Sequence, residues 1–164
     1  MIEEKTNAVM ASYLASIIVN EEQRNWLLTG LREAYKGDCT SNTNVRNIVF
    51  CLIGDGGTGK TTFLDVVSSV FADNGKVVKK LDVAPDCDYS DTSDLFTCEG
   101  FMDPSKLKFI VGDIGGLLLL TATKRPDMDP LDHGLNRRVT FIDVQRSMKF
   151  DRDEAYRSLL GELK

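Results

Sequence analysis

The sequence predicts an α/β fold in which a mainly parallel sheet is flanked by helices and preceded by a helical hairpin. Apolar runs in residues 46–53, 107–111 and 117–120 are typical of strands buried on both faces of a parallel sheet. The first run leads directly into a glycine-rich loop and then into an amphipathic stretch, which is the order of a strand–loop–helix unit. Two helical patterns precede that first strand, so the hairpin comes before the core.

The N-terminal region carries the pattern of two helices. Within residues 2–19, apolar side chains recur at helical spacing at Met10, Tyr13, Leu14, Ile17 and Ile18. Asn20 is suited to cap the second helix, with Gln23 as its capping-box partner, and Gly37 is suited to end it. We therefore expect a helical hairpin in residues 1–44.

The predicted core occupies residues 45–150. The stretch after the glycine-rich loop has an apolar helical face and ends at an Asn-Gly pair. Residues 76–83 and 137–144 predict further strands. A terminal helix is expected in residues 151–164, with Asp151 as its N-cap.

Composition limits the classes of protein that the chain can belong to. Its 164 residues suit one domain, and its net charge of −5 makes it no obvious nucleic-acid binder. Residues 82–103 hold seven acidic residues and no Lys or Arg, which predicts a solvated acidic loop. No apolar stretch is long enough to span a membrane, and the N-terminus lacks the pattern of a secretion signal. The four cysteines form no CxxC pair and are expected to be free thiols.

The glycine-rich loop matches the phosphate-binding pattern GxxxxGK[ST]. Its glycines let backbone N–H groups turn toward an anion, and the dipole of the following helix favours the same anion. Lys60 can reach the β- and γ-phosphates, and the Thr61 hydroxyl suits Mg²⁺. The sequence therefore predicts a P-loop NTPase core that binds ATP and Mg²⁺ through Gly54, Asp55, Gly56, Gly57, Thr58, Gly59, Lys60, Thr61 and Thr62.

The stretch IGDGGTGKTTFLDVVSSVF, with a hairpin before it, resembles viral superfamily 3 helicases, in particular the helicase part of poxvirus-type primase-helicases. Downstream, LLLLTATKRPDMDPLDHGLNRRVTFIDVQRSMKF is similar to that family's order of an apolar strand, a sensor 1 motif, a loop, an arginine pair and a strand. The likeness covers roughly residues 10–150. It implies an ATPase that assembles as a hexameric ring and acts on single-stranded or forked DNA.

The resemblance also implies roles for residues outside the loop. Thr123 lies where the family has its sensor 1 asparagine, and Thr58 likewise stands where the family favours asparagine. Arg137 and Arg138 match the arginine pair, one of which acts as an arginine finger on the nucleotide of a neighbouring subunit.

An ATPase of this kind also needs a Walker B strand, an apolar run that ends in one or two acids that hold Mg²⁺. Asp113, at the end of KFIVGD, is the favoured catalytic acid and, with Thr61, the favoured metal ligand. Two alternatives stay open, since LKFIVGD also resembles a later segment of the family: Asp82 supplies the acid, or the Walker B strand is missing. Only three residues separate Asp113 from the next apolar run, too few for the family's DNA-gripping hairpin.

Together these patterns predict the ATP-binding domain of a viral or mobile-element superfamily 3 DNA helicase that hydrolyses ATP during DNA replication. Its expected place is the cytoplasm or a host-cell replication site. The incomplete Walker B signal and the missing hairpin leave one alternative, a degenerate nucleotide-binding remnant without unwinding activity. The size of the chain and the segment TKRPDMD, which suits a substrate loop, leave another, a small-molecule P-loop kinase. His133, the only histidine, is expected at the surface rather than in catalysis.

Overall fold

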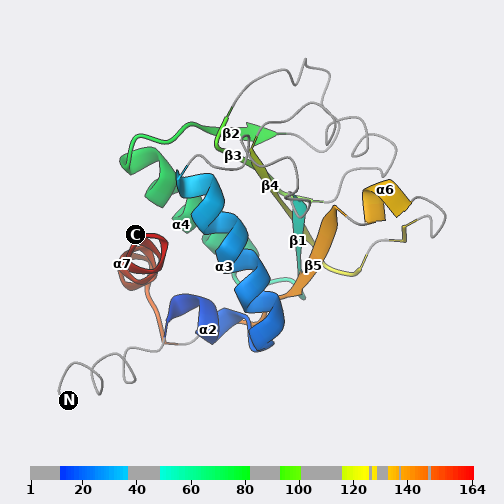
Figure 1. Ribbon diagram of the computed structural model, residues 1–164. Helices are drawn as coiled ribbons and strands as arrows, with labels where there is room; N and C mark the ends of the chain where they lie inside the picture. The colour runs from blue at the N-terminus through cyan, green and yellow to red at the C-terminus, as the bar shows by residue number, and fades with distance from the viewer. Residues whose placement is uncertain are drawn as a thin grey trace.

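The computed structural model describes residues 12–36, 49–81, 93–100, 116–125, 127–128, 133–136, 138–147 and 149–164. In this part of the chain five strands form one sheet, and all neighbouring strands are parallel (Figure 1). Their order across the sheet is β2-β3-β4-β1-β5. The strands are β1 (Val49–Ile53), β2 (Val78–Leu81), β3 (Leu95–Cys98), β4 (Leu117–Ala122) and β5 (Val139–Asp143). The predicted α/β fold with a parallel sheet is therefore confirmed.

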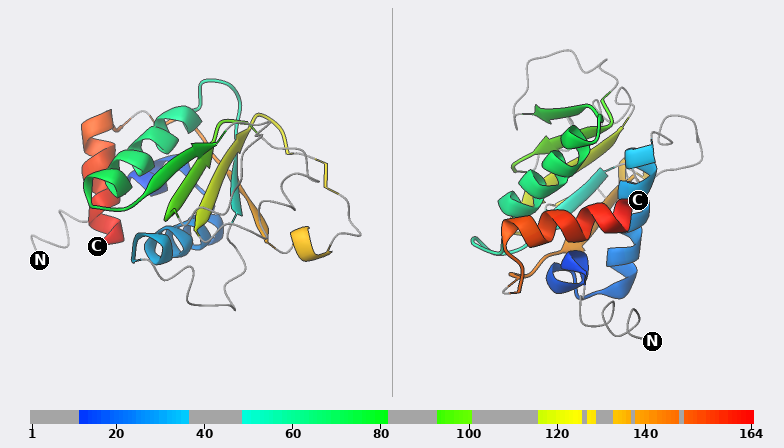
Figure 2. Two further views of the ribbon diagram at one scale, coloured as in Figure 1. Left: turned by 90° about the horizontal axis from the view of Figure 1, so that it is seen from above. Right: turned by 90° about the vertical axis from the view of Figure 1, so that its left-hand side faces the viewer.

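Helices flank this sheet and account for most of the remaining described residues. They are α2 (Tyr13–Ile17), α3 (Glu21–Lys36), α4 (Lys60–Asp73), α6 (His133–Asn136) and α7 (Arg152–Leu163). The right-hand view of Figure 2 shows α3, α4 and α7 in front of the sheet. No helix in the described part of the chain is long and apolar enough to cross a bilayer.

The two faces of the sheet are both apolar, which explains the uninterrupted apolar runs in the sequence. Side chains on one face pack with α2, α3, α4 and α7 in a single core cluster, and these are Phe50, Leu52, Leu95, Leu117, Leu119 and Ile142. The alternate side chains on the other face are equally buried, among them Val49, Cys51, Phe96, Leu118 and Leu120. Parallel strands buried on both faces lose the alternation of polar and apolar residues.

The helix caps agree with the sequence at two positions. The Gln23 N–H donates to Asn20 Oδ1 at 3.1 Å, and the Glu154 N–H donates to Asp151 Oδ1 at 2.8 Å. The predicted capping-box role of the Gln23 side chain is wrong, because its amide bonds instead to Asp143 of β5. Asn20 therefore caps α3 alone, and Gln23 ties α3 to the sheet.

Three other expectations differ from the structure. The acidic stretch is not a loop throughout, since four of its residues form the buried strand β3. The short helix α6 lies in a segment that was expected to be a loop. The helix α2 begins after its N-cap Ser12 and ends before its C-cap Ile18, so it is shorter than the helical pattern in residues 2–19 indicates. Residues 2–11 and the apolar run 107–111 lie outside the described residues.

Candidate functional site

The glycine-rich loop lies between β1 and α4, at the carboxyl end of an interior strand. The Gly54 N–H donates to the Ala122 carbonyl at 3.1 Å, which fastens the start of the loop to the end of β4. The Thr58 N–H donates to the Asp55 carbonyl at 3.2 Å and closes a turn within the loop. The loop therefore has a fixed position where ligands bind in open parallel sheets, outside the carboxyl ends of the strands.

The Lys60 ammonium is folded back into this loop. Its Nζ donates to the carbonyl of Gly54 and, at 3.1 Å, to that of Asp55, and it lies 3.5 Å from Thr58 Oγ1. Backbone carbonyls of the loop thus hold the positive charge of Lys60 against the loop. A phosphate placed against the loop would meet this charge directly.

The N-terminus of α4 supplies the second feature of an anion site. No side chain caps this helix, and its N-cap is Gly59 with φ +90°. The first N–H groups of a helix have no acceptor within the helix and carry the positive end of its dipole. Gly57 has φ +85°, so both glycines adopt a left-handed backbone that other residues rarely take. Thr61 and Thr62, in the first turn, are exposed.

A pocket of about 520 Å³ lies beside the loop and brings the start of α4 together with the ends of β3 and β4. It is lined by Lys60, by Gly100 after β3, and by residues at and after the end of β4. Thr123, the predicted sensor 1 residue, is among these, so the structure places it in the same pocket as Lys60. Its role in orienting water stays a prediction.

Glu99 is a candidate residue that no motif in the sequence singles out. It follows β3 directly and is exposed, and it lines a second pocket of about 220 Å³ together with Thr97 and with Asp65 of α4. Thr61 lies four residues before Asp65, on the same side of the helix. Glu99 therefore lies on the α4 side of the sheet, beside the part of the helix that carries Asp65. The signal in the sequence was the run LFTC ending in an acid, which the surrounding acidic residues obscured.

These residues fit a magnesium–nucleotide complex. Mg²⁺ in nucleotide sites is held by one or two carboxylates or hydroxyls together with phosphates and water, rather than by a protein cage. The Thr61 hydroxyl and the Glu99 carboxylate are ligands of that kind. Within the described ranges no three His, Cys, Asp or Glu side chains gather as a ready metal site. Asp113 and Asp82, the acids considered from the sequence, lie outside the described residues.

Arg138 does not join this group of residues. Its carbonyl accepts a hydrogen bond of 3.2 Å from the Val49 N–H, at the start of β1, whereas the loop follows the end of that strand. The length of β1 separates the two places by ~13 Å at about 3.3 Å per residue. The backbone of Arg138 therefore lies at the opposite end of β1 from the loop of its own chain, and Arg137 lies outside the described residues.

Cys51 lies in β1, three residues before the loop, and is a buried free thiol. Burial raises the pKa of this thiol to about 12, against the opposing effect of the Lys60 charge. The thiol is therefore protonated at neutral pH and serves as a packing residue.

Comparisons with known proteins give a likeness in fold. No protein-family model matches the chain, and no curated protein matches it. Among solved structures, the fold is similar to the apo A form of the NrS-1 C-terminal region, with a TM-score of 0.60 and 13% sequence identity. The match covers 92% of this chain and 42% of that one. At this identity the likeness shows the fold alone, and the chain spans less than half of the structure it matches.

Proposed function

We propose that the chain is the ATP-binding domain of a superfamily 3-type DNA helicase that hydrolyses ATP. The observation that carries the proposal is the Lys60 ammonium inside a glycine loop at an uncapped helix N-terminus. Both features attract the same ligand, a polyphosphate. The motif resemblance described above supplies the choice of family, and the fold is compatible with it.

Each residue of the site has a task in this proposal. Phosphate oxygens accept hydrogen bonds from the loop N–H groups, and Lys60 turns from the loop carbonyls to the β- and γ-phosphates. Mg²⁺, when bound, neutralises phosphate charge, and the Thr61 hydroxyl and the Glu99 carboxylate would hold it. Thr123, in the pocket beside Lys60, orients the attacking water through its hydroxyl. The acid contributed by Glu99 replaces or accompanies the one predicted at Asp113.

The proposal includes a ring of subunits on DNA. The distance between Arg138 and the loop of its own chain supports action on a neighbour's nucleotide, because an arginine finger in trans must project from another edge of the subunit. Lys124 and Arg125, exposed beside the pocket that contains Lys60, are candidate contacts for DNA phosphates. Replication of viral or mobile-element DNA is the process proposed for such a ring.

The test measures ATP binding and ATP hydrolysis, with and without single-stranded DNA, for three variants. Lys60→Ala should lower hydrolysis by about 100-fold, the usual effect of removing one charge stabiliser. Lys149→Ala, which removes an exposed lysine elsewhere, is the matched control. Glu99→Gln should retain ATP binding and lose hydrolysis. Hydrolysis that survives Lys60→Ala unchanged would sink the proposal.

A second candidate, a nucleotide-binding remnant, is favoured by one observation at the end of β3. Glu99 is followed by Gly100 rather than by a second acid, so β3 supplies a single carboxylate. A remnant would bind ATP through the loop with little turnover in the wild type, and Glu99→Gln would then change nothing. Measurements of ATP binding and hydrolysis for the wild type and Glu99→Gln therefore separate the two candidates.

A further inference from the structure

One edge of β5 has no neighbouring strand among the described residues. The Val49 N–H donates to the Arg138 carbonyl at 3.2 Å, and the Val144 N–H donates to the Ile53 carbonyl at 2.8 Å, so both bonds lie on the β1 side. Because backbone groups alternate in direction along a strand, Val139, Phe141 and Asp143 direct their N–H and C=O groups to the other side. In the described part of the chain, these outward groups form an edge of the sheet without a neighbouring strand.

The end of this edge is already occupied by an amide. The Asp143 N–H donates to Gln23 Oε1 at 2.8 Å, and Gln23 Nε2 donates to Asp143 Oδ2 at 3.2 Å. The Gln23 side chain thus makes the hydrogen bond that a peptide carbonyl of an added strand would make. For Val139 and Phe141, no partner of the outward groups lies among the described residues. The open part of the edge therefore presents the same kind of backbone groups as the end that Gln23 occupies.

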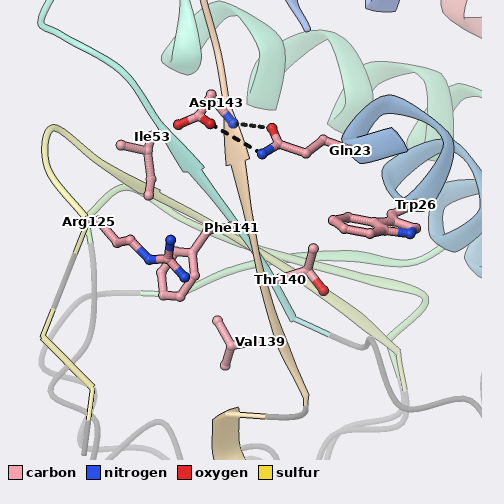
Figure 3. A pocket seen from close by; sticks show the side chains of 8 residues that line it. All are labelled: Gln23, Trp26, Ile53, Arg125, Val139, Thr140, Phe141 and Asp143. Atoms are coloured by element: carbon pink, nitrogen blue, oxygen red, sulfur yellow. Dashed lines mark hydrogen bonds between the residues drawn. The ribbon is translucent and has the colours of Figure 1, made fainter. Parts of the chain in front are cut away.

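A hollow of about 510 Å³ follows the open part of the edge (Figure 3). Phe141 and Arg125 lie on one side of β5, and Trp26 and Gln23 of α3 lie on the other. The Arg125 guanidinium covers the Phe141 ring, 4.5 Å from its centroid. Trp26, the only tryptophan of the chain, is 42% exposed. The hollow thus offers a cationic wall and an aromatic wall with backbone hydrogen-bonding groups between them.

We propose that this edge binds an extended peptide segment of a partner protein by strand addition. The backbone of the peptide forms hydrogen bonds with the outward N–H and C=O groups of Val139 and Phe141. It lies next to the Gln23 amide, which occupies the edge at Asp143. Alternate side chains of the peptide fall on opposite sides of the sheet. An acidic side chain pairs with Arg125 on one side, and an apolar side chain covers Trp26 on the other.

The composition of the edge supports this choice. Free edges are commonly protected by proline, by inward-pointing charges or by a bulge, and the open part of β5 reads Val-Thr-Phe without any of these. Arg125 also lines the pocket that contains Lys60, so a bound peptide touches a residue of the proposed nucleotide site. The peptide site itself goes beyond the proposed function and does not depend on nucleotide binding.

The experiment uses Trp26 emission in the nucleotide-free protein. The probe is the acetylated and amidated peptide TVEVEVT, and two matched peptides carry N-methyl groups on either the valines or the glutamates. In an added strand, either the valine N–H groups or the glutamate N–H groups face β5, and the other set faces away. The peptide methylated on the set that faces β5 should therefore bind about tenfold more weakly than the parent, and the other methylated peptide should bind like the parent. Arg125→Glu should weaken the parent by about fivefold, and Arg157→Glu on α7 should leave it unchanged.

Three results would overturn the proposal. Equal binding of all three peptides would show that backbone pairing is absent, and unchanged Trp26 emission with all of them would show that nothing binds at the edge. The edge would instead bind a second copy of this protein if two results were found together. Trp26 emission would change with protein concentration, and sedimentation would show a dimer that the peptide does not dissociate. Loss of ATP binding in Lys60→Ala affects none of these readouts, so the two proposals fail separately.

Discussion

The backbone N–H of Gly100 donates a hydrogen bond of 2.9 Å to Thr121 Oγ1, and this bond joins the carboxyl ends of β3 and β4. Thr121 is buried, and Glu99 comes directly before the donor. The bond therefore fixes the point at which the chain carrying Glu99 leaves the sheet. It is the described contact that connects the proposed acid to the pocket shared by Lys60 and Thr123.

Replacing Thr121 by valine tests this connection. Thr121→Val keeps the shape of the side chain and removes the acceptor of the Gly100 N–H, so it should lower the free energy of unfolding by about 1 kcal/mol. If Glu99 acts in hydrolysis, kcat should fall while ATP affinity changes little. Urea unfolding and steady-state kinetics measure the two effects. Thr121→Ser keeps the hydroxyl and should retain kcat; a loss equal to that of the valine variant would show that the hydroxyl is not responsible.

Helix α3 lies close against the sheet at Gly30. A Cβ at this position would lie 2.6 Å from the buried Phe50 ring. Gly30→Ala gains about 1 kcal/mol of helix propensity, but overpacking in a core costs about 1–3 kcal/mol. We expect a net loss of about 1 kcal/mol in the free energy of unfolding, measured by urea denaturation.

Two further variants check the reason for that loss. Gly161 lies in α7 with nothing within 4 Å of a Cβ, so Gly161→Ala should stabilise by about 0.5–1 kcal/mol. Adding Phe50→Leu should make room for the Gly30→Ala methyl group. Phe50→Leu should therefore lower the free energy of unfolding less in the Gly30→Ala variant than in the wild type. Destabilisation by Gly161→Ala as well would point to a general intolerance of alanine rather than to crowding against Phe50.

The fold could be predicted from the sequence where consecutive residues share the same environment. β1 and β4 are buried on both faces, so their apolar runs stand out without any knowledge of tertiary structure. The place of the loop between a strand and a helix was equally clear, because the order of an apolar run, a glycine-rich segment and an apolar helical face marks such a unit. The caps of α3 and α7 followed from single residues next to the first turn.

β3 shows where such patterns fail. The strand has four residues, one of them Thr97, and Asp94 and Glu99 flank it, so a count of charge over the whole stretch indicated a loop. The acids lie at the ends of the strand and not on its faces, and a composition average cannot represent that difference. Gln23 shows a second kind of failure, because its partner Asp143 is distant in sequence and only the packing of α3 against β5 brings them together.

Asp151 should make the stability of the protein depend on pH. Its hydrogen bond from the Glu154 N–H lowers the pKa of the carboxyl below its ordinary value of 3.8. A pKa that is lower in the folded state gives stability that is present above the ordinary pKa and is lost as the pH falls through the folded value. The difference in Tm between the wild type and Asp151→Ala should therefore be largest near pH 7 and shrink below pH 3.8. Asp151→Asn keeps a capping oxygen that does not titrate, so its Tm should differ from that of Asp151→Ala by a nearly constant amount across this pH range.

Glu162 should have the opposite dependence. Burial raises the pKa of this α7 carboxyl above its ordinary value of 4.5, against a hydrogen bond from Ser12 and the charges of Arg32 and Arg24. Its Oε2 atom is buried and has no hydrogen-bond partner among the described residues. A carboxyl with a raised folded-state pKa costs little stability below pH 4.5, and the cost appears as the pH rises through the folded value. Glu162→Gln removes the charge, so its Tm should exceed that of the wild type at pH 7 and approach it at pH 4. Glu33→Gln on α3 controls for a change in net charge. A lower Tm for Glu162→Gln at pH 7 would mean that the arginines and Ser12 outweigh the burial of the carboxylate.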